Sequence, residues 1–408
     1  MNQKKKVLII TPCLEMPVPA VKGGAVSTLI ESLIIQNENH NKFDFTVVSV
    51  YDSEAVEKSK MYKNTKFIYI HNSNFYNTVD SAYEFLESKI KKKKPRNPHR
   101  YALKLSLINR FKKILRLGDY DRVVFENMSF MLETLKDKKI ANKYKGKLFF
   151  HIHNDVSKKF YFDGMKECTI LSISNYLSKR LIKTCGPDIM NNFKILHNGF
   201  DYKRFSQELN NEEKLKIKEN LNIPSDKKIV LFVGRIVPVK GISELTTAFN
   251  QIDRDDLILL VIGSHNFGSS QTSEFETKMK KAFSDMGDKV RFTGYVRYDE
   301  VWKYYKIADF AVLPSTGEEP AGLTIVESMA AGLPVITTIS GGIPEFIDSR
   351  FGILLENNAE LTNNLKKSIE QVADNLPEWK EKGIAASKHI PSVVDEEKYY
   401  NTFCEYLK

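Results

Sequence analysis

Short apolar runs alternate with longer amphipathic stretches along most of the 408-residue chain. In the first half, these runs are rich in β-branched residues and lack polar alternation, a pattern typical of parallel strands buried on both faces. Helix-length segments separate most of them, which predicts βαβ units. The strands are expected at Lys6–Thr11, Phe43–Val50, Phe67–Ile70, Arg122–Phe125, Leu148–Ile152, Thr169–Ile173 and Phe193–Leu196.

The pattern restarts after a polar, charged stretch from Asp201 to Lys228, which we interpret as a linker that is helical in part. The chain is too long for one core. We therefore predict an α/β protein of two doubly wound, Rossmann-like domains, residues 1–200 and 201–390. A last helix, at about 391–408, is expected to pack back on the first domain. The second set of strands is Ile229–Val233, Leu257–Ile262, Val290–Phe292, Phe310–Leu313, Val335–Thr337 and Gly352–Leu355.

The strongest chemical motif is the segment Glu318–Ile336, which carries Glu319 before a turn and Glu327 within a helix that begins near Leu323. Free N–H groups at a helix start suit a phosphate. Glu319 could accept hydrogen bonds from sugar hydroxyls, and Glu327 could hold a ribose diol. The plain alternative is a capped amphipathic helix after a turn.

Two further motifs follow expected strands. Arg235 and Lys240 come after the strand that ends at Val233, and together they could clamp a diphosphate. Gly23 and Gly24 open the first helix, where a backbone without side chains can approach an anion. Taken singly, the Arg–Lys pair could equally be two surface cations, and the glycine pair could equally be a flexible loop.

Together these motifs resemble glycosyltransferase family four, whose members are retaining enzymes of GT-B fold. The resemblance is carried by VGRIVPVKG at 233–241 and EEPAGLTIVESMAAGLPVI at 318–336, in that order. Pro17–Ala25, His153-Asn154, Asn198–Asp201, the turn at Gly294 and the strand around Leu313 also match. Residues 53–116 match no part of the pattern, as expected of a region that shapes the acceptor site.

The resemblance implies two Rossmann-like domains that face each other across a cleft. It implies retaining transfer of a hexose-type sugar from a nucleotide diphosphate sugar to a saccharide or lipid-linked saccharide acceptor, as in bacterial surface polysaccharide synthesis. The first domain would bind the acceptor and the second the nucleotide sugar. No protein nucleophile or general base is required, because the leaving phosphate can take the acceptor's proton.

The implied site is as follows. Arg235 and Lys240 neutralise the departing diphosphate, Glu319 binds the donor sugar, and Glu327 holds the ribose. His153 lies near the donor sugar, although His151 is two residues away and a single histidine is more often structural. The remaining donor contacts come from Gly23, Gly24, Tyr295, Val296, Ala321, Gly322, Leu323 and Thr324.

No cofactor and no metal ion are expected. The two Asp-x-Asp tripeptides, Asp119–Asp121 and Asp253–Asp255, precede strands and so lie away from the expected ligand face. Cys13, Cys168, Cys185 and Cys404 match no zinc or disulfide spacing. No apolar run is long enough for a signal peptide core or a membrane span, so a cytoplasmic protein is expected.

The net charge of +10 comes from one segment, because Lys89–Arg116 holds twelve Lys or Arg residues and no carboxylate. Apolar positions between Leu103 and Leu115 share one helical face. This composition suits a helix on the anionic inner face of the plasma membrane, or a core helix with a solvated basic side. A nucleic-acid partner is not expected, since no recognised nucleic-acid-binding fold is present.

Two alternatives to the transferase remain open. The chain could be another GT-B enzyme, such as a nucleotide-sugar epimerase. It could also be a non-catalytic partner subunit that keeps the fold; the four charged residues Arg235, Lys240, Glu319 and Glu327 argue against this.

Overall fold

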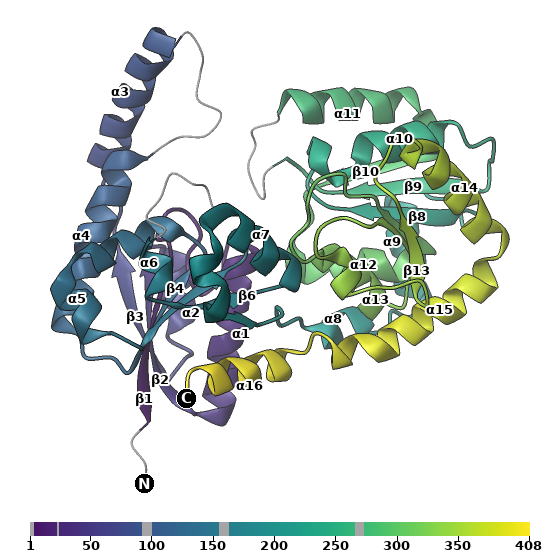
Figure 1. Cartoon of the computed structure of the whole chain (residues 1–408). Helices are drawn as coiled ribbons and strands as arrows, with labels where there is room; N and C mark the ends of the chain where they lie inside the picture. The colour runs from purple at the N-terminus through teal and green to yellow at the C-terminus, as the bar shows by residue number, and fades with distance from the viewer. Residues whose placement is uncertain (1–3, 23, 92–99, 155–162, 266–272) are drawn as a thin grey trace. The chain divides into compact units, whose positions relative to one another are not determined.

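The computed structural model describes residues 4–22, 24–91, 100–154, 163–265 and 273–408. The chain forms two compact units, each with its own sheet (Figure 1). The first unit contains Met1–Ile173, Leu177–Leu196 and Tyr399–Lys408; the second contains Ser174–Tyr176 and His197–Lys398. The division therefore falls after Leu196, whereas the sequence analysis placed it after residue 200.

The first unit is built on a parallel sheet in the order β3-β2-β1-β4-β5-β6-β7. Each strand overlaps a predicted apolar run, so these predictions are confirmed. Helices cover the sheet (Figure 1), and the apolar residues of β1, including Val7 and Ile9, are fully buried. The strands are β1 Lys5–Ile10, β2 Phe43–Val50, β3 Thr65–Ile70, β4 Arg122–Glu126, β5 Leu148–Ile152, β6 Thr169–Ser172 and β7 Phe193–Ile195.

The helices of this part of the chain differ in length and role. Most pack on the sheet, whereas α3 extends away from it (Figure 1). They are α1 Ala25–His40, α2 Ser53–Ser59, α3 Asn74–Lys91, α4 Tyr101–Leu117, α5 Lys138–Lys143, α6 Asp163–Lys166 and α7 Asn175–Cys185, with 3-10 helices η1 Ser129–Lys136 and η2 Pro187–Asn192.

The last helix, α16 (Glu396–Tyr406), completes the core of the first unit. Phe403 is fully buried, with its ring edge-on to Phe45 at 6.4 Å between centroids. The Tyr400 hydroxyl donates to Asn37 Oδ1 at 2.7 Å, and the Asn37 amide bonds both polar groups of the Phe43 backbone. The end of the chain is thus tied to α1 and β2.

The second unit is built on a parallel sheet in the order β10-β9-β8-β11-β12-β13. All six predicted strands are present, which confirms the second half of the fold prediction. They are β8 Lys228–Val233, β9 Leu257–Ile262, β10 Val290–Gly294, β11 Phe310–Leu313, β12 Val335–Thr338 and β13 Gly352–Leu355. The remaining elements are α8 Tyr202–Ser206, α9 Asn211–Asn220, α10 Ile242–Asn250, α11 Glu274–Asp285, α12 Tyr298–Ile307, α13 Leu323–Ala330, α14 Leu361–Asp374 and α15 Leu376–His389, with 3-10 helices η3 Pro238–Lys240, η4 Gly287–Lys289, η5 Ile343–Glu345 and η6 Ile390–Ser392.

The interpretation of residues 201–228 as a linker is wrong. This stretch forms α8 and α9, and both belong to the second unit. Phe205 of α8 is fully buried, and its ring packs against those of Phe200 and Tyr305. A few buried aromatic side chains make the stretch part of a core despite its polar composition.

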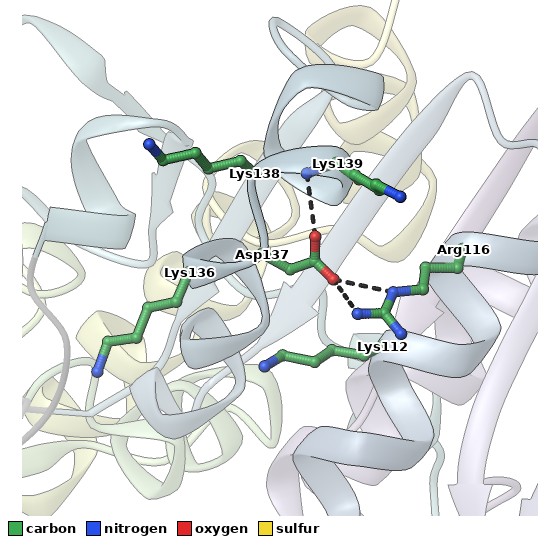
Figure 2. Close-up of a pocket in the computed structure, with 6 residues that line it drawn as sticks. All are labelled: Lys112, Arg116, Lys136, Asp137, Lys138 and Lys139. Atoms are coloured by element: carbon green, nitrogen blue, oxygen red, sulfur yellow. Dashed lines mark hydrogen bonds and ion pairs between the residues drawn. The ribbon is translucent and has the colours of Figure 1, made fainter.

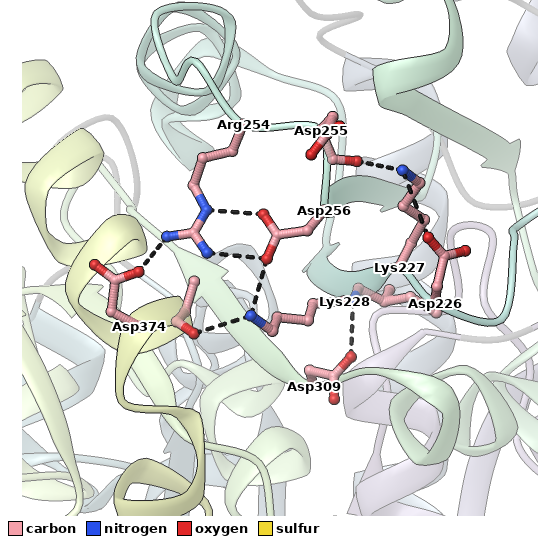
Figure 3. Close-up of polar contacts among 10 residues, drawn as sticks. Asp226, Lys227, Lys228, Arg254, Asp255, Asp256, Asp309 and Asp374 are labelled. Carbon is pink, nitrogen blue, oxygen red and sulfur yellow. Dashed lines mark hydrogen bonds and ion pairs between the residues drawn. The ribbon is translucent and has the colours of Figure 1, made fainter.

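A polar network closes the amino-terminal edge of the second sheet (Figure 3). Arg254 donates two hydrogen bonds to Asp256, at 2.8 and 2.9 Å, and also pairs with Asp374 of α14. Asp256 also accepts from Lys228, and the hydrogen bonds from Arg254 hold the pKa of this carboxyl well below its usual range. Asp253 and Asp255 are exposed beside this network, at the edge opposite the strand carboxyl ends.

The apolar face of α4 packs in the first unit, which agrees with the second of the two interpretations of this segment, a core helix. Its members are buried in the first unit, because the same face supplies the helix with its contacts to the domain core. The buried residues are Leu103, Leu107, Ile108, Phe111 and Leu115. Residues 92–99 of the basic segment lie outside the described residues. In the part of the chain that is described, no helix is both long and apolar enough to cross a membrane.

We expect Phe403→Ala to destabilise the first unit by about 3 to 5 kcal/mol, because it leaves a cavity against Phe45 in a closed core. Glu405→Ala, an exposed position on the same helix, is the control and should change stability by less than about 0.5 kcal/mol. Urea unfolding followed by circular dichroism measures both variants. Equal stabilities would show that α16 is not part of this unit's cooperative core.

Candidate active site

The candidate site lies where the strand order of the second sheet reverses. The chain proceeds from β8 outward to β9 and β10, then returns to β11 on the other side of β8. The connections that leave the carboxyl ends of β8 and β11 therefore diverge, and ligands bind at such a reversal in open α/β sheets. Lys240 follows β8, and Glu319 follows β11.

The two loops meet because a glycine permits it. Gly241 has φ +70°, and a Cβ atom there would lie 1.8 Å from the Pro314 carbonyl oxygen. The backbone N–H groups of Thr316 and Gly317 both donate to the Val239 carbonyl, at 3.1 and 2.9 Å. The short turn η3 is thereby fixed against the loop that follows β11.

A pair of adjacent glycines, Gly341 and Gly342, packs against the backbone of Glu319. The Gly342 N–H donates to the Glu319 carbonyl at 2.7 Å, and a Cβ atom on Gly341 would lie 2.2 Å from the same oxygen. Sequence reasoning missed both glycines. Their signal was the pair Gly341-Gly342, which begins three residues after the end of the strand β12.

The two loops bring Lys240 and Glu319 into direct contact. The Lys240 ammonium donates to Glu319 Oε2, and the two side chains are 20% and 19% exposed. Because the pair is formed and partly screened from water, a ligand that binds here meets a cation and a carboxylate that already lie side by side. These two predicted site residues are thus brought together.

Helix α13 begins beside this pair. Gly322 precedes it with φ +63°, a left-handed conformation that suits glycine. Ile325 N–H bonds back to the Gly322 carbonyl, whereas the N–H groups of Leu323 and Thr324 have no backbone partner among the described residues. Ala321, just before the turn, is buried. The helix start therefore presents two N–H donors to an anion.

Glu327 lies in the second turn of α13 and is buried. Burial raises the pKa of this carboxyl to about 7, although a hydrogen bond from Tyr305 and the charge of Lys240 act in the opposite direction. The Tyr305 hydroxyl donates to Glu327 Oε2 at 2.6 Å. Sequence reasoning missed Tyr305, because a tyrosine on α12 carries no local signal of its partner.

The other predicted residues of this unit lie at the same sheet edge. Arg235, two residues beyond β8, is exposed and forms no ion pair with any described residue. Tyr295 and Val296 follow β10, two strands from β8; Tyr295 is exposed and Val296 half-buried. The structure thus does not bring Arg235 into contact with the Lys240–Glu319 pair.

The first unit holds its own cluster at the end of β4 and β5. Glu126 is fully buried and accepts a hydrogen bond from His151 at 3.3 Å and one from His153 at 3.1 Å. Burial would raise the pKa of Glu126, but the two imidazoles lower it to about 2. Asn127 accepts from the His153 backbone N–H at 3.2 Å, which fixes the strand end.

Both histidines of this cluster are buried. His151 lies inside β5 and is fully buried, and His153 follows the strand with 5% exposure. Glu126 was missed, although a carboxylate that ends the apolar run Val123–Phe125 was a signal. The ligand atoms of the three side chains lie within 4.8 Å of one another, so the group could also hold a metal ion.

The glycine loop after β1 is described only in part. Gly24 precedes α1 with φ +100°, and a Cβ atom there would meet Met16 at 3.3 Å. Gly23 lies outside the described residues. The first sheet reverses its order between β1 and β4, so the loop of Gly24 leaves one strand that flanks the reversal and Glu126 ends the other.

Comparison with known proteins agrees with this geometry. Residues 213–386, most of the second unit, match the family model of glycosyl transferases group 1. An uncharacterized glycosyltransferase of Methanocaldococcus jannaschii is 30% identical over 189 residues, which cover 44% of this chain and 46% of that protein. The lipopolysaccharide 1,2-N-acetylglucosaminetransferase of Salmonella typhimurium is 25% identical over 350 residues, covering 84% of this chain and 82% of that protein.

Among solved structures, the chain is similar to Anabaena HepE in complex with UDP-glucose. The TM-score is 0.70 at 17% identity, and the alignment covers 99% of both chains. This likeness identifies the fold as GT-B, with two Rossmann-like domains. The second unit thus matches the group 1 glycosyltransferases, and the chain as a whole has the GT-B fold.

Proposed function

We propose that this glycosyltransferase moves a hexose-type sugar from a nucleotide diphosphate sugar to a saccharide or lipid-linked saccharide acceptor, with retention of the anomeric configuration. The observation that carries the proposal is the Lys240–Glu319 pair at the reversal of the second sheet, beside the start of α13. A pathway of surface glycan synthesis supplies such acceptors.

The site's charges suit the departure of a diphosphate. When the bond between the anomeric carbon and the phosphate oxygen breaks, negative charge builds on the β-phosphate, and fixed donors there lower the barrier most. Lys240 and the N–H groups of Leu323 and Thr324 are such donors. Arg235, exposed at the same edge of the sheet, supplies a further cation.

The site's acceptors suit the rest of the donor. Glu319 can take hydrogen bonds from sugar hydroxyls, and Glu327 from the two ribose hydroxyls, with Tyr305 beside it. The acceptor hydroxyl then attacks the anomeric carbon from the side that the diphosphate leaves, and its proton passes to the leaving phosphate oxygen. Neither step requires a protein nucleophile or a general base.

Two relatives support the proposed substrates. HepE was solved with UDP-glucose, which supports a nucleotide-sugar donor. The Salmonella relative is named for adding N-acetylglucosamine to lipopolysaccharide, which supports a saccharide acceptor on a lipid. Retention rests on the resemblance of the motifs at 233–241 and 318–336 to family four.

We expect a nucleotide-sugar panel to contain a donor that raises the unfolding temperature, because a ligand that binds only the folded state stabilises it by mass action. With that donor, proton NMR of the first-formed product should show the donor's anomeric configuration. Activity should persist in a chelator, because the diphosphate is neutralised by side chains and N–H groups. An inverted product would refute the retaining reaction.

The metal-free site has its own test in the chelator. Activity lost in chelator and restored by Mg²⁺ or Mn²⁺ would refute it, and Glu126 with its two histidines would be the first group to test.

Lys240→Ala should lower kcat by roughly two to four orders of magnitude, since one preorganised charge at the leaving group is lost. Arg235→Ala should lower kcat in the same direction but by less, because its side chain is exposed and unanchored. Lys278→Ala, an exposed lysine on α11, is the matched control and should keep wild-type turnover. Wild-type kcat in both site variants would remove the phosphate-binding assignment.

Glu327 should make nucleotide binding depend on pH near 7, where its pKa lies. Only the ionised carboxylate accepts from both ribose hydroxyls, so affinity should rise as pH increases through 7. Glu327→Gln should bind the nucleotide more weakly and with a flat pH profile. Isothermal titration at several pH values measures this, and a wild-type profile as flat as that of the variant would contradict the ribose assignment.

The unliganded protein supplies an independent check of the same pKa. A carboxyl whose pKa is raised on folding binds more protons in the folded state, so the free energy of unfolding falls as pH rises from about 4.5 to 7. The loss should be roughly 2 to 3 kcal/mol relative to Glu327→Gln. Urea unfolding of both proteins across this range measures it.

A further inference from the structure

An exposed aromatic stack lies at the carboxyl edge of the first sheet. The strands β2 and β3 pair in parallel up to Val50 and Ile70. The residues that come next, Tyr51 and His71, therefore leave the sheet side by side, and their rings stack with 3.9 Å between centroids. Both residues are exposed, Tyr51 by 44%. The Tyr51–His71 stack is thus a flat aromatic surface at the edge where open α/β sheets bind their ligands.

Neighbouring groups hold the stack in place. The Tyr51 backbone N–H donates to the Ile70 carbonyl at 2.9 Å. The Tyr69 ring lies edge-on to the Tyr51 ring at 6.5 Å between centroids, and the Tyr69 hydroxyl donates to the Ala55 carbonyl at 3.0 Å. The stack is therefore formed before any ligand binds, which lowers the entropic cost of binding.

An arginine of α4 is the cation beside the stack. Arg110 Nη1 donates to the His71 carbonyl at 2.6 Å. The Arg110 charge also acts on the loop after β1, because it opposes the burial that raises the pKa of the Cys13 thiol to about 12. Arg110 is half-buried, and it forms no ion pair with any residue that the structure describes. Most of its five N–H donors therefore remain available to a ligand.

Carboxylates on the neighbouring segments are already engaged. Asp52 caps the start of α2 and pairs with Lys22 at 2.6 Å. Glu15, in the loop after β1, pairs with Arg100. Arg110 is thus a partly desolvated cation without a carboxylate partner among the described residues, and a bound anion would offset the cost of that desolvation.

We propose that the Tyr51–His71 stack and Arg110 form a subsite for an anionic sugar of the acceptor, a pyranose that carries a carboxylate or a phosphate. The apolar C–H face of a pyranose can pack on an exposed aromatic face. A guanidinium binds a carboxylate or phosphate through two parallel N–H bonds. The biological use of the subsite rests on the proposed function, since it names the class of acceptor. Binding itself can be measured without any transfer.

The two parts of the subsite disfavour simpler ligands. A free inorganic anion would use Arg110 and leave the aromatic stack without a partner. A neutral sugar would use the stack and leave the guanidinium without a counter-ion. A sugar that carries its own charge uses both, and the contact of Arg110 with the His71 carbonyl places the two parts within one residue of each other.

A second cation of α4 supplies a matched control. Lys112 lines a hollow near the end of the helix, together with Arg116 and Asp137 (Figure 2). Arg116 pairs with Asp137 there, whereas Lys112 forms no ion pair with any described residue. This end of α4 leads to the amino end of β4, at the opposite edge of the sheet from the stack. Lys112→Gln therefore removes one positive charge from the same helix without touching the subsite.

The test is saturation-transfer NMR of the full chain, without a donor, with methyl glucuronide, glucose 6-phosphate and methyl glucoside. Wild type should bind at least one of the two anionic sugars roughly tenfold more tightly than the glucoside, because hydrogen bonds to charged groups are strong. Arg110→Gln should remove this preference but keep the binding of the glucoside. Arg110→Lys should keep part of the preference, since an ammonium has the charge without the planar fork. Lys112→Gln should behave as wild type.

The stack has its own variants. Tyr51→Ala should weaken the binding of charged and neutral sugars by the same factor, roughly three- to tenfold. Tyr51→Phe should bind as wild type does, because the ring is retained. Tyr101→Ala, at a position that is 45% exposed, is the control and should change neither affinity. Unchanged unfolding temperatures show that each variant is folded.

Three results would overturn the proposal. One is wild type that binds no sugar, or binds charged and neutral sugars equally. Another is an Arg110→Gln variant that loses both kinds of sugar alike. The third is an unchanged Tyr51→Ala variant together with full competition by inorganic phosphate, which would mean a site for any anion. None of these results affects the donor panel or the Lys240 variant, so failure of the subsite and failure of the transferase function are distinguished.

Discussion

The candidate site depends on the close approach of two loops that leave neighbouring strands in opposite directions. At Gly241 a side chain would collide with the Pro314 carbonyl, and at Gly341 it would collide with that of Glu319. Because glycine has no Cβ atom, the backbones of the two segments can come into contact at these positions and form hydrogen bonds. Without that contact, Lys240 and Glu319 would be two charges on separate loops. With it, they form a single ion pair at the end of the sheet.

The pKa values of two buried carboxyl groups, Glu126 and Glu327, are shifted in opposite directions because their hydrogen-bond partners differ. Glu126 has two imidazoles as partners, and they lower its pKa to about 2 despite full burial. Glu327 has a neutral phenol as its hydrogen-bond partner, and its pKa rises to about 7. Glu126 is therefore a permanent anion that orients two histidines. Glu327 is poised between two states, and a bound ribose would favour the charged one.

The polar residues at the two edges of the second sheet have different roles. At the amino ends of the strands, Arg254, Asp256 and Lys228 satisfy one another in a closed network (Figure 3). At the carboxyl ends, charged groups and helix N–H groups are left available. Asp253 and Asp255 are exposed at the first edge, opposite the strand carboxyl ends, so this motif takes no part in the proposed reaction.

The sequence by itself determined the fold class, the strands and most residues of the candidate site. Apolar runs of β-branched residues can be buried on both faces only in a parallel sheet, so the strand pattern is readable locally. Three features were decided only by tertiary structure. The polar stretch at 201–228 joins a core because Phe205 finds aromatic partners far away in sequence. The apolar side of α4 is buried because the first unit supplies a surface for it. Glu126 and Tyr305 acquire their roles from partners on other elements, and the local sequence names neither partner, although the carboxylate at the end of an apolar run marks Glu126 as unusual.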